Sequence, residues 1–413
     1  MWSNLAEGSW LTRQRMRGVA LLTGAISLAT LLYLLAGRSG TLDGWGRPLG
    51  TDFSNVYAAG QMALAGRADE VWSWDSHYAV QQAIHHDPNV PFYGWHYPPP
   101  FLLIASALAL LPYLLALLAW QGATLSAAVL LVRRIVPGRD TLLLASAAPI
   151  VFVCLGHGQN GFLTAALLGG GLLMLERRAF TAGLLLGCLV YKPQFALIVG
   201  PLLLVTGNGR AIAGAAASSL SLIAITFMVW GWPVWQAFLD SLPLTRQIVI
   251  ESGATGWGKI ESPFAMTRMW GGGISLAYAL QGAATVLAIG AMLWLCRAAA
   301  SPLRNAAACA AVLLSTPYVL DYDYVVLGLG GAFLVRDAAG RGWLRWEKSL
   351  LALVWIAPLF ARQAATLALL PVAQATALIV LILALRRAVI LDGAAEPLKR
   401  TWPSRRSHAK SAQ

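Results

Sequence analysis

One acidic residue, Asp52, stands where its carboxylate could act as a base. It follows the first long apolar run by about sixteen residues and is followed at once by the amphipathic stretch 53–60. A carboxylate in such a place could take the proton of a hydroxyl group while the hydroxyl oxygen attacks a second substrate. An aspartate in front of an amphipathic run is also a common helix N-cap. The sequence leaves both roles open for Asp52.

The same polar segment ends in a group of aromatic residues around His96. The imidazole of His96 could form a hydrogen bond with a sugar or a phosphate. Its neighbours Trp95 and Tyr97 are explained more simply as anchors in the headgroup layer of a membrane, where tryptophan and tyrosine are enriched. We keep His96 and Tyr97 as candidates for substrate contact.

The glycine-rich hexapeptide 156–161 interrupts two apolar runs. Glycine lets backbone N–H groups approach an anion closely, and the side chains of Gln159 and Asn160 add hydrogen-bond donors. The spacing is neither that of a phosphate-binding P-loop nor that of a dinucleotide-binding loop, and the lysine of a P-loop is missing. A tight turn between two helices explains the hexapeptide equally well.

Lys192 is the one charged residue between Arg178 and Arg210, and Gln194 follows it closely. An ionisable side chain in such an apolar stretch indicates function by default. A cation there would suit the phosphate of a lipid. A lysine at the end of a span that extends its amine toward water would give the same pattern.

Two further polar sites stand next to apolar runs. Arg268 is a candidate for bidentate phosphate binding, since its guanidinium matches the geometry of phosphate. Asp321 and Asp323 offer two carboxylates in a turn between two runs. The alternatives are an arginine at the membrane interface and a solvated turn.

Composition identifies the environment in which these residues must be positioned. Of the 413 residues, 58% are hydrophobic and only 12% are charged, whereas soluble domains carry roughly a quarter charged residues. The net charge of +12 comes from basic residues at the ends of apolar runs, which is typical of cytoplasmic loops and does not indicate nucleic-acid binding. The four cysteines lie inside apolar runs, without the spacing of a metal site or disulfide framework.

The apolar runs predict about twelve membrane spans with both termini in the cytosol. The run 98–132 is either two spans or one span with a broken half-helix near Pro112. The run 179–206 is either one bent span or two short ones around Lys192. Keeping the basic residues in the cytosol favours one net crossing in the first run and two in the second. The expected fold class is therefore an all-α polytopic membrane protein.

Two long polar segments, 37–97 and 231–272, become external loops in this topology. Residues 57–66 and 74–85 of the first loop are suited to short helices that lie in the membrane interface. The basic stretch 391–413 is predicted to be a disordered cytoplasmic tail that touches anionic lipid. Residues 1–390 would then form a single transmembrane domain.

Short motifs stand in a characteristic order within residues 18–330. They are Asp52-Phe53, Tyr57-Ala58-Ala59-Gly60, Ala63-Leu64, Gly66, Val71-Trp72, Tyr97-Pro98-Pro99, Leu111-Pro112-Tyr113, Trp120, Gly158-Gln159, Ala182-Gly183-Leu184 and Lys192-Pro193-Gln194. The pattern resembles the bacterial membrane glycosyltransferases of family 87, which include polyprenyl-phosphate-mannose-dependent mannosyltransferases of the GT-C superfamily. The part up to Gln194 is the most specific. Some members carry a histidine in the turn where this chain has Asp321 and Asp323.

The resemblance implies a GT-C-type bundle of about twelve transmembrane helices, with interfacial helices in the first external loop. It implies inverting transfer of a hexose, with mannose expected, from a polyprenyl-phosphate donor to a hydroxyl of a lipid or glycan. The site would face the periplasm from the bacterial cytoplasmic (inner) membrane, with Asp52 as the catalytic base. We expect the substrates to be bound by Tyr57, His96, Tyr97, Gln159, Asn160, Lys192, Gln194, Arg268, Asp321 and Asp323. No metal, cofactor or nucleic acid is expected; the partners are the donor, the acceptor and membrane lipids.

The residues agree with this chemistry. An inverting transfer needs one base for the acceptor hydroxyl, and a lipid phosphate leaves without a strong acid if positive charge and oriented donors surround it. Two other classes of protein remain open. A multi-span transporter or flippase would also show broken helices, although the two halves of the chain carry no internal repeat. A non-catalytic membrane assembly factor would leave Asp52, Lys192 and Arg268 without a shared purpose.

Overall fold

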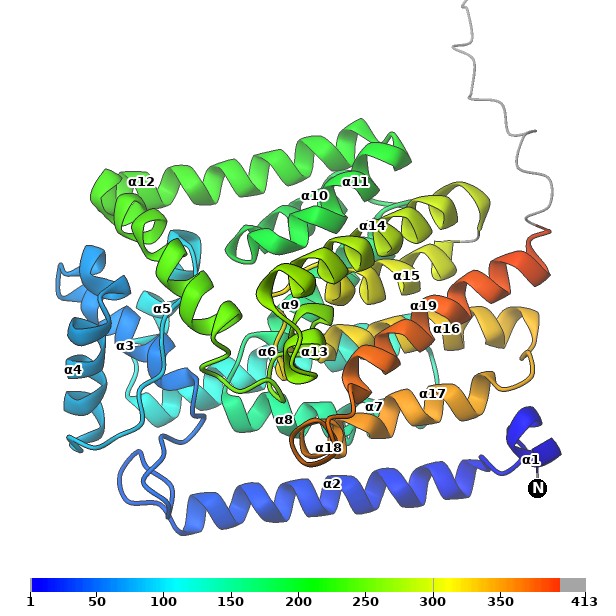
Figure 1. Ribbon diagram of the computed structural model, residues 1–413, viewed down its shortest axis with the longest axis horizontal. Coiled ribbons are helices and arrows are strands. Elements are labelled where there is room, and N and C mark those ends of the chain that lie inside the picture. Colours follow the sequence, from blue (N-terminus) through cyan, green and yellow to red (C-terminus); the bar gives the residue numbers. More distant parts are fainter. Residues whose placement is uncertain (1, 300, 394–413) are drawn as a thin grey trace, which may run out of the picture.

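The computed structural model describes residues 2–299 and 301–393, which form nineteen α-helices joined by turns and short 3-10 helices (Figure 1). Isolated β-bridges are the sole extended pairings among these residues. The predicted all-α architecture is therefore confirmed for the part of the chain that is described. The predicted basic tail lies outside it, apart from residues 391–393.

Five helices are long and apolar enough to cross a membrane within the described residues. They are α2 (Arg13–Ala36), α6 (Tyr113–Ile135), α12 (Gly209–Thr245) with the π-helical turn η4 (Arg246–Glu251), α14 (Ile274–Ala298) and α19 (Val372–Leu391). A sixth is obtained if Glu347–Leu359 and Ala361–Ala368, which meet at 72°, form one span. The chain fits a polytopic membrane protein, as predicted, but the predicted number of about twelve spans is not confirmed.

The remaining predicted spans are shorter helices. Four apolar stretches of 10–17 residues are α5 (Pro99–Leu108), α9 (Gly161–Met174), α10 (Ala179–Gly187) with η2 (Cys188–Tyr191), and η3 (Pro193–Phe195) with α11 (Ala196–Thr206). Prolines decide where they break, because the residue before a proline is pushed out of the helical conformation. Lys192, before Pro193, has φ −124° and ψ 73°. Both runs that the sequence left open, 98–132 and 179–206, are therefore broken in the structure. The first is interrupted between α5 and α6 at Pro112.

The first polar loop contains three short helices: α3 (Phe53–Leu64), η1 (Ala68–Trp72) and α4 (Trp74–His85). The helix predicted over 74–85 is confirmed at both ends, and the one predicted over 57–66 begins at Phe53 instead. Gly60 allows α3 to press against α5, since a Cβ there would lie 2.1 Å from the carbonyl oxygen of Ala105. This contact fixes the loop to the bundle; its position at a membrane interface stays a prediction.

The second polar segment is not a loop throughout. Gly231 has φ 74° and ψ −170°, which is strained for any residue with a Cβ, and the helix resumes behind this kink through Pro233 to Thr245. The prediction of a loop from 231 to 272 is therefore wrong for its first part. The irregular chain begins after Glu251, and α13 (Pro263–Met269) closes the segment.

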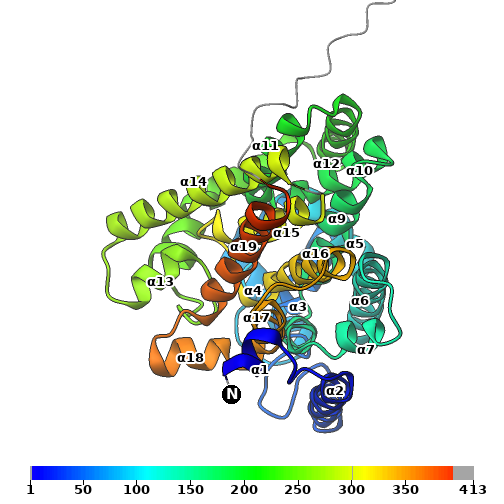
Figure 2. The same cartoon turned by 90° about the vertical axis from the view of Figure 1, so that its right-hand side faces the viewer.

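A buried helix, α15 (Ser301–Leu314), forms the centre of the bundle and packs against α14, α16 (Val325–Arg341) and α19. At the edge, α2 contacts α7 (Thr141–Ser146) and α8 (Pro149–His157) and is otherwise largely exposed (Figures 1 and 2). The start of α2 and the end of α19 lie at one end of the bundle, and the loop after α2 lies at the other (Figure 1). The elements not yet named are α1 (Trp2–Glu7), η5 (Asp321–Tyr324), α17 (Glu347–Ile356), η6 (Ala357–Leu359) and α18 (Ala361–Ala368).

Candidate active site

The carboxylate of Asp52 points into the protein and away from the helix that it precedes. Its two oxygens lie 3.0 and 3.3 Å from the Nζ atom of Lys259, and the side-chain amide of Gln159 donates to it at 3.3 Å. The residue is 5% exposed and makes no capping hydrogen bond to α3. Asp52 thus occupies the N-cap position of α3 without the side-chain capping bond, and its carboxylate belongs to a polar cluster.

His157, at the end of α8, connects this cluster to the turn η5. Its Nδ1 atom lies 3.1 Å from Thr51 Oγ1 and 3.9 Å from Asp52, while Nε2 lies 3.5 Å from Asp321 Oδ2. The left-handed residue Gly158 ends α8 at this point, and a Cβ on it would lie 2.6 Å from Cβ of Phe53. The imidazole therefore stands between two carboxylates that are far apart in the sequence.

Two of the three glycines in the hexapeptide 156–161, Gly158 and Gly161, have a packing function. A Cβ on Gly161 would lie 2.3 Å from the carbonyl oxygen of Tyr322, as Gly158 meets the loop before α3. Trp120 and Gln121 donate side-chain hydrogen bonds to backbone carbonyls of the same turn. In the described structure Gly158 and Gly161 allow protein segments to pack closely, which agrees with the alternative of a tight turn between two helices.

Two buried carboxyl groups next to His157 differ in their surroundings. Burial would raise the pKa of Asp321, but the hydrogen bond from His157 and the charges of His157, Lys259 and Arg362 outweigh it and lower that pKa. Burial, together with the charges of Asp321 and Asp323, raises the pKa of Glu261 well above its usual range. The site therefore favours an ionised carboxylate at Asp321 and a protonated carboxyl at Glu261.

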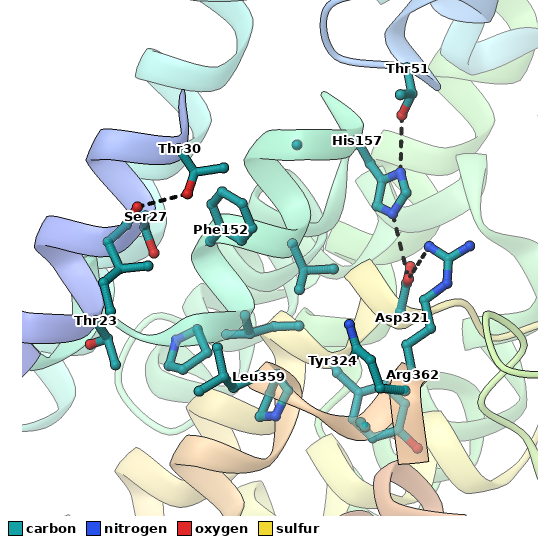
Figure 3. A pocket seen from close by; sticks show the side chains of 18 of the residues that line it. Thr23, Ser27, Thr30, Thr51, Phe152, His157, Asp321, Tyr324, Leu359 and Arg362 are labelled. Carbon is teal, nitrogen blue, oxygen red and sulfur yellow. Dashed lines mark hydrogen bonds and ion pairs between the residues drawn. The ribbon is translucent and has the colours of Figure 1, made fainter. Parts of the chain in front are cut away.

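A cavity of about 380 Å³ opens beside this cluster, between α2, α8 and α18. His157, Asp321 and Arg362 point toward one another at one side of it, and Thr23, Ser27, Thr30 and Phe152 line the other side (Figure 3). Ile26, Leu34 and Val153 add to the apolar wall. A small charged group and a long apolar chain could be accommodated together.

The comparisons with known proteins give a family. The model of glycosyltransferase family 87 matches residues 95–317, which is more than half of the chain. The chain belongs to glycosyltransferase family 87. Neither the curated proteins nor the solved structures include a match. Membership of family 87 indicates an enzyme that transfers a sugar, so the transporter and assembly-factor alternatives lose their support. Gln159, Lys192, Lys259 and Arg268 lie within the matched residues of this family 87 protein, whereas Asp52, Asp321 and Arg362 lie outside them.

Among the predicted substrate-binding residues, Tyr97 and Gln159 form a chain of hydrogen bonds that leads to Asp52. The phenol of Tyr97 donates to Gln159 Oε1 at 2.9 Å, and the amide nitrogen of Gln159 faces the Asp52 carboxylate. Tyr97 is buried. Tyr97 and Gln159 therefore orient the carboxylate through a hydrogen-bonded chain. The sequence analysis treated the two residues as separate substrate contacts.

Lys192 and Asp323 form a buried ion pair with each other. Lys192 is 3% exposed, and its ammonium also lies over the rings of Phe195 and Tyr322. The second oxygen of Asp323 accepts from the backbone of Leu320. The charge that the sequence suggested for a lipid phosphate is thus neutralised inside the protein, where it fixes η5 to the break between η2 and η3.

Arg268 is likewise engaged internally. Its guanidinium donates to the carbonyl oxygens of Gly272 and Glu251 and lies over the ring of Trp257. These contacts close the second polar segment around α13. Phosphate binding by Lys192 or Arg268 stays a prediction, and each residue would first have to leave these partners.

The other predicted residues occupy varied positions. Tyr57 donates to the carbonyl oxygen of Leu111. His96 pairs with Thr245 at 3.0 Å, and burial lowers its pKa to about 4. Asn160 is buried, and its side-chain amide has no hydrogen-bond partner among the described residues. Gln194 is half-buried in η3.

Sequence reasoning missed three site residues: His157, Lys259 and Arg362. Two of them carried a signal. His157 lies within the hexapeptide already singled out, and Lys259 is the one charged residue between Glu251 and Glu261. Arg362 carried none, because a single arginine beside an apolar run is ordinary at a membrane interface.

Proposed function

We propose that this family 87 glycosyltransferase moves a hexose, with mannose as the expected sugar, from a polyprenyl-phosphate donor to a hydroxyl group of a lipid or glycan. Asp52 is the base. The observation that carries the proposal is the position of this carboxylate, paired with Lys259 next to a cavity that is charged at one side and apolar at the other. The proposed reaction requires neither a metal nor a cofactor.

In the proposed reaction the acceptor oxygen attacks the anomeric carbon from the face opposite the phosphate. The bond from this carbon to the phosphate oxygen breaks, and the electron pair leaves with the polyprenyl phosphate. Asp52 takes the proton of the acceptor hydroxyl. The product is inverted, and the negative charge that grows on the leaving phosphate is stabilised by nearby cations, of which Lys259 is one.

The shape and lining of the cavity support a lipid donor. The apolar residues of α2 and α8 give a long hydrocarbon chain a wall, and His157, Asp321 and Arg362 give its phosphate a place (Figure 3). His157 connects this place to Asp52. Since α2 touches the bundle mainly through α7 and α8, a chain can reach the cavity from the surrounding lipid along this helix.

The distribution of arginine supports a site on the outer face of a bacterial cytoplasmic membrane. Arg13, Arg15 and Arg17 open α2, and Arg386 and Arg387 lie near the end of α19, at the end of the bundle opposite the loop before Asp52 (Figure 1). The positive-inside rule assigns that end to the cytosol. The proposal includes about twelve crossings, with short apolar helices crossing where neighbouring helices surround them.

A transfer assay tests the proposal. Purified wild-type protein, given radiolabelled polyprenyl-phosphate mannose and a membrane-lipid extract, should label a lipid or glycan. Asp52→Asn should lower the rate at least about a hundredfold, the scale for removing a positioned base. Asp75→Asn, an exposed aspartate on α4, is the matched control and should retain the wild-type rate. Near-normal turnover by the Asp52→Asn protein would refute the assignment of the base.

A further inference from the structure

The short helix α18 brings an arginine to the cavity from a part of the chain outside the family match. The pair of α17 with η6 meets α18 at 72°, and α18 ends at Leu369 in the left-handed conformation. Its apolar residue Leu367 is 83% exposed, whereas Arg362 and Gln363 line the cavity. The helix therefore has one side toward the surroundings and one toward the candidate site.

The guanidinium of Arg362 is loosely held. It is 49% exposed and lies 3.7 Å from Asp321 Oδ2, beyond hydrogen-bond distance. Its guanidinium donates no hydrogen bond to any of the described residues, although arginine carries five N–H donors. Figure 3 shows the side chain directed at Asp321. Its donors are thus available to a further anion.

The groups around Arg362 would allow its guanidinium to exchange the carboxylate of Asp321 for another anion. Asp321 also has His157 as a partner, so this carboxylate would keep a stabilising contact if Arg362 turned away. Glu261, which lines the same cavity, favours its protonated form and so adds no full negative charge. α18 packs against the segment that carries Lys259, since a Cβ on Gly258 would lie 2.6 Å from Thr366 Oγ1. Lys259 and Arg362, from two adjoining elements, therefore both place positive charge near Asp321.

We propose that Arg362 binds the phosphate of the lipid donor, exchanging the carboxylate of Asp321 for phosphate oxygens, so that α18 forms one wall of the donor site. The inference rests on the proposed lipid-phosphate donor and names a residue for it. Arg362 is a binding residue and takes no proton in the transfer. Because guanidinium holds phosphate through two parallel N–H donors, lysine replaces it only in part.

A binding experiment with the full chain in nanodiscs tests the inference. The probes are undecaprenyl phosphate and undecaprenol, which differ by the phosphate, with inorganic phosphate as competitor to separate a free anion from a lipid headgroup. Wild-type protein should bind the phosphorylated lipid more tightly than the alcohol. Arg362→Gln should weaken binding of the phosphorylated lipid roughly tenfold or more, Arg362→Lys should weaken it less, and neither should change binding of undecaprenol. Arg178→Gln, an exposed arginine outside the site, is the matched control.

A second variant distinguishes binding from a purely structural role. Asp321→Asn removes the competing carboxylate and should tighten binding of undecaprenyl phosphate, and the gain should disappear in the double variant with Arg362→Gln. Unchanged discrimination between the two lipids in Arg362→Gln would overturn the role of Arg362 and leave the proposed function intact. Wild-type protein that does not distinguish the two lipids would overturn the lipid-phosphate donor itself, and this inference with it.

Discussion

Two arginine clusters in this glycosyltransferase differ in how tightly their charges are held. Arg387 on α19 is 1% exposed and donates to Asp337 at 2.7 Å, to Glu347 at 2.6 Å and to a backbone carbonyl. Arg362 on α18 is half exposed, and among the described residues its ion pair is with Asp321 at 3.7 Å. The first cluster connects α16, α17 and α19, and the second faces a cavity.

The difference separates charges that fix the fold from charges that can exchange partners. A fully buried, multiply bonded arginine cannot leave without exposing uncompensated carboxylates, which is costly. A half-exposed arginine at ion-pair distance can leave at small cost, because water replaces its partner. By the same criterion Lys192 belongs with Arg387, whereas Lys259, which is 11% exposed and paired with Asp52, stands between the two groups.

The largest effect should come from breaking the tight cluster. Arg387→Met leaves Glu347 buried without its ion-pair partner and Asp337 with Arg341 alone, so we expect the free energy of unfolding to fall by about 3–5 kcal/mol. Denaturant titration in detergent measures it, with Arg386→Met, on the adjacent half-buried arginine that donates to a backbone carbonyl, as control. The transfer rate of the folded fraction should stay near that of wild type. A large loss of transfer rate with unchanged stability would contradict the assignment of Arg387 to the charges that fix the fold.

Replacing Lys259 should lower the transfer rate more than the stability, which is the reverse of the effect expected for Arg387. Lys259→Met removes the cation beside Asp52, so the transfer rate should fall about ten- to a hundredfold, with a smaller change in the unfolding transition. Lys259→Arg should recover part of the rate because it keeps the charge. Steady-state kinetics with the radiolabelled donor and thermal unfolding of the same samples measure the two quantities. Equal loss of rate and stability would assign Lys259 to the structural group.

The smallest effect concerns pH and the buried histidines of the first loop. His85 is held by Thr41 and Ser54, and burial lowers its pKa to about 4; burial lowers the pKa of His77 to about 3. The unfolded chain binds these protons near pH 6.5, so stability should fall as the pH drops from about 6.5 toward 4.

Thermal unfolding between pH 7 and 5 measures this dependence. His85→Gln should reduce the slope, because one of the groups that take up a proton on unfolding is removed. His86→Asn, on the exposed neighbour, is the control, and asparagine tolerates the left-handed backbone there. If the dependence of stability on pH is unchanged in His85→Gln, His85 does not contribute to that dependence.

The sequence by itself determined the class of protein, much of its helical layout and the central carboxylate. Hydrophobicity and charge placement indicate membrane helices from composition alone, prolines mark the breaks near residues 112 and 193, and amphipathic periodicity predicts the helix over 74–85. Asp52 was singled out because a carboxylate that precedes an amphipathic stretch could act as a base, and because it opens the series of motifs that resembles family 87. These features depend on neighbours in the chain.

Only the tertiary structure decided which charges meet. Lys259 reaches Asp52 across 207 positions, and Lys192 is paired with Asp323 across 131, so one predicted phosphate ligand became a structural pair and an unremarked lysine became part of the site. Periodicity gives the face of a helix on which a side chain lies but not the element that packs there. Pairing of distant charges follows from that packing, which is why the partners of Asp52 could not be predicted from the sequence.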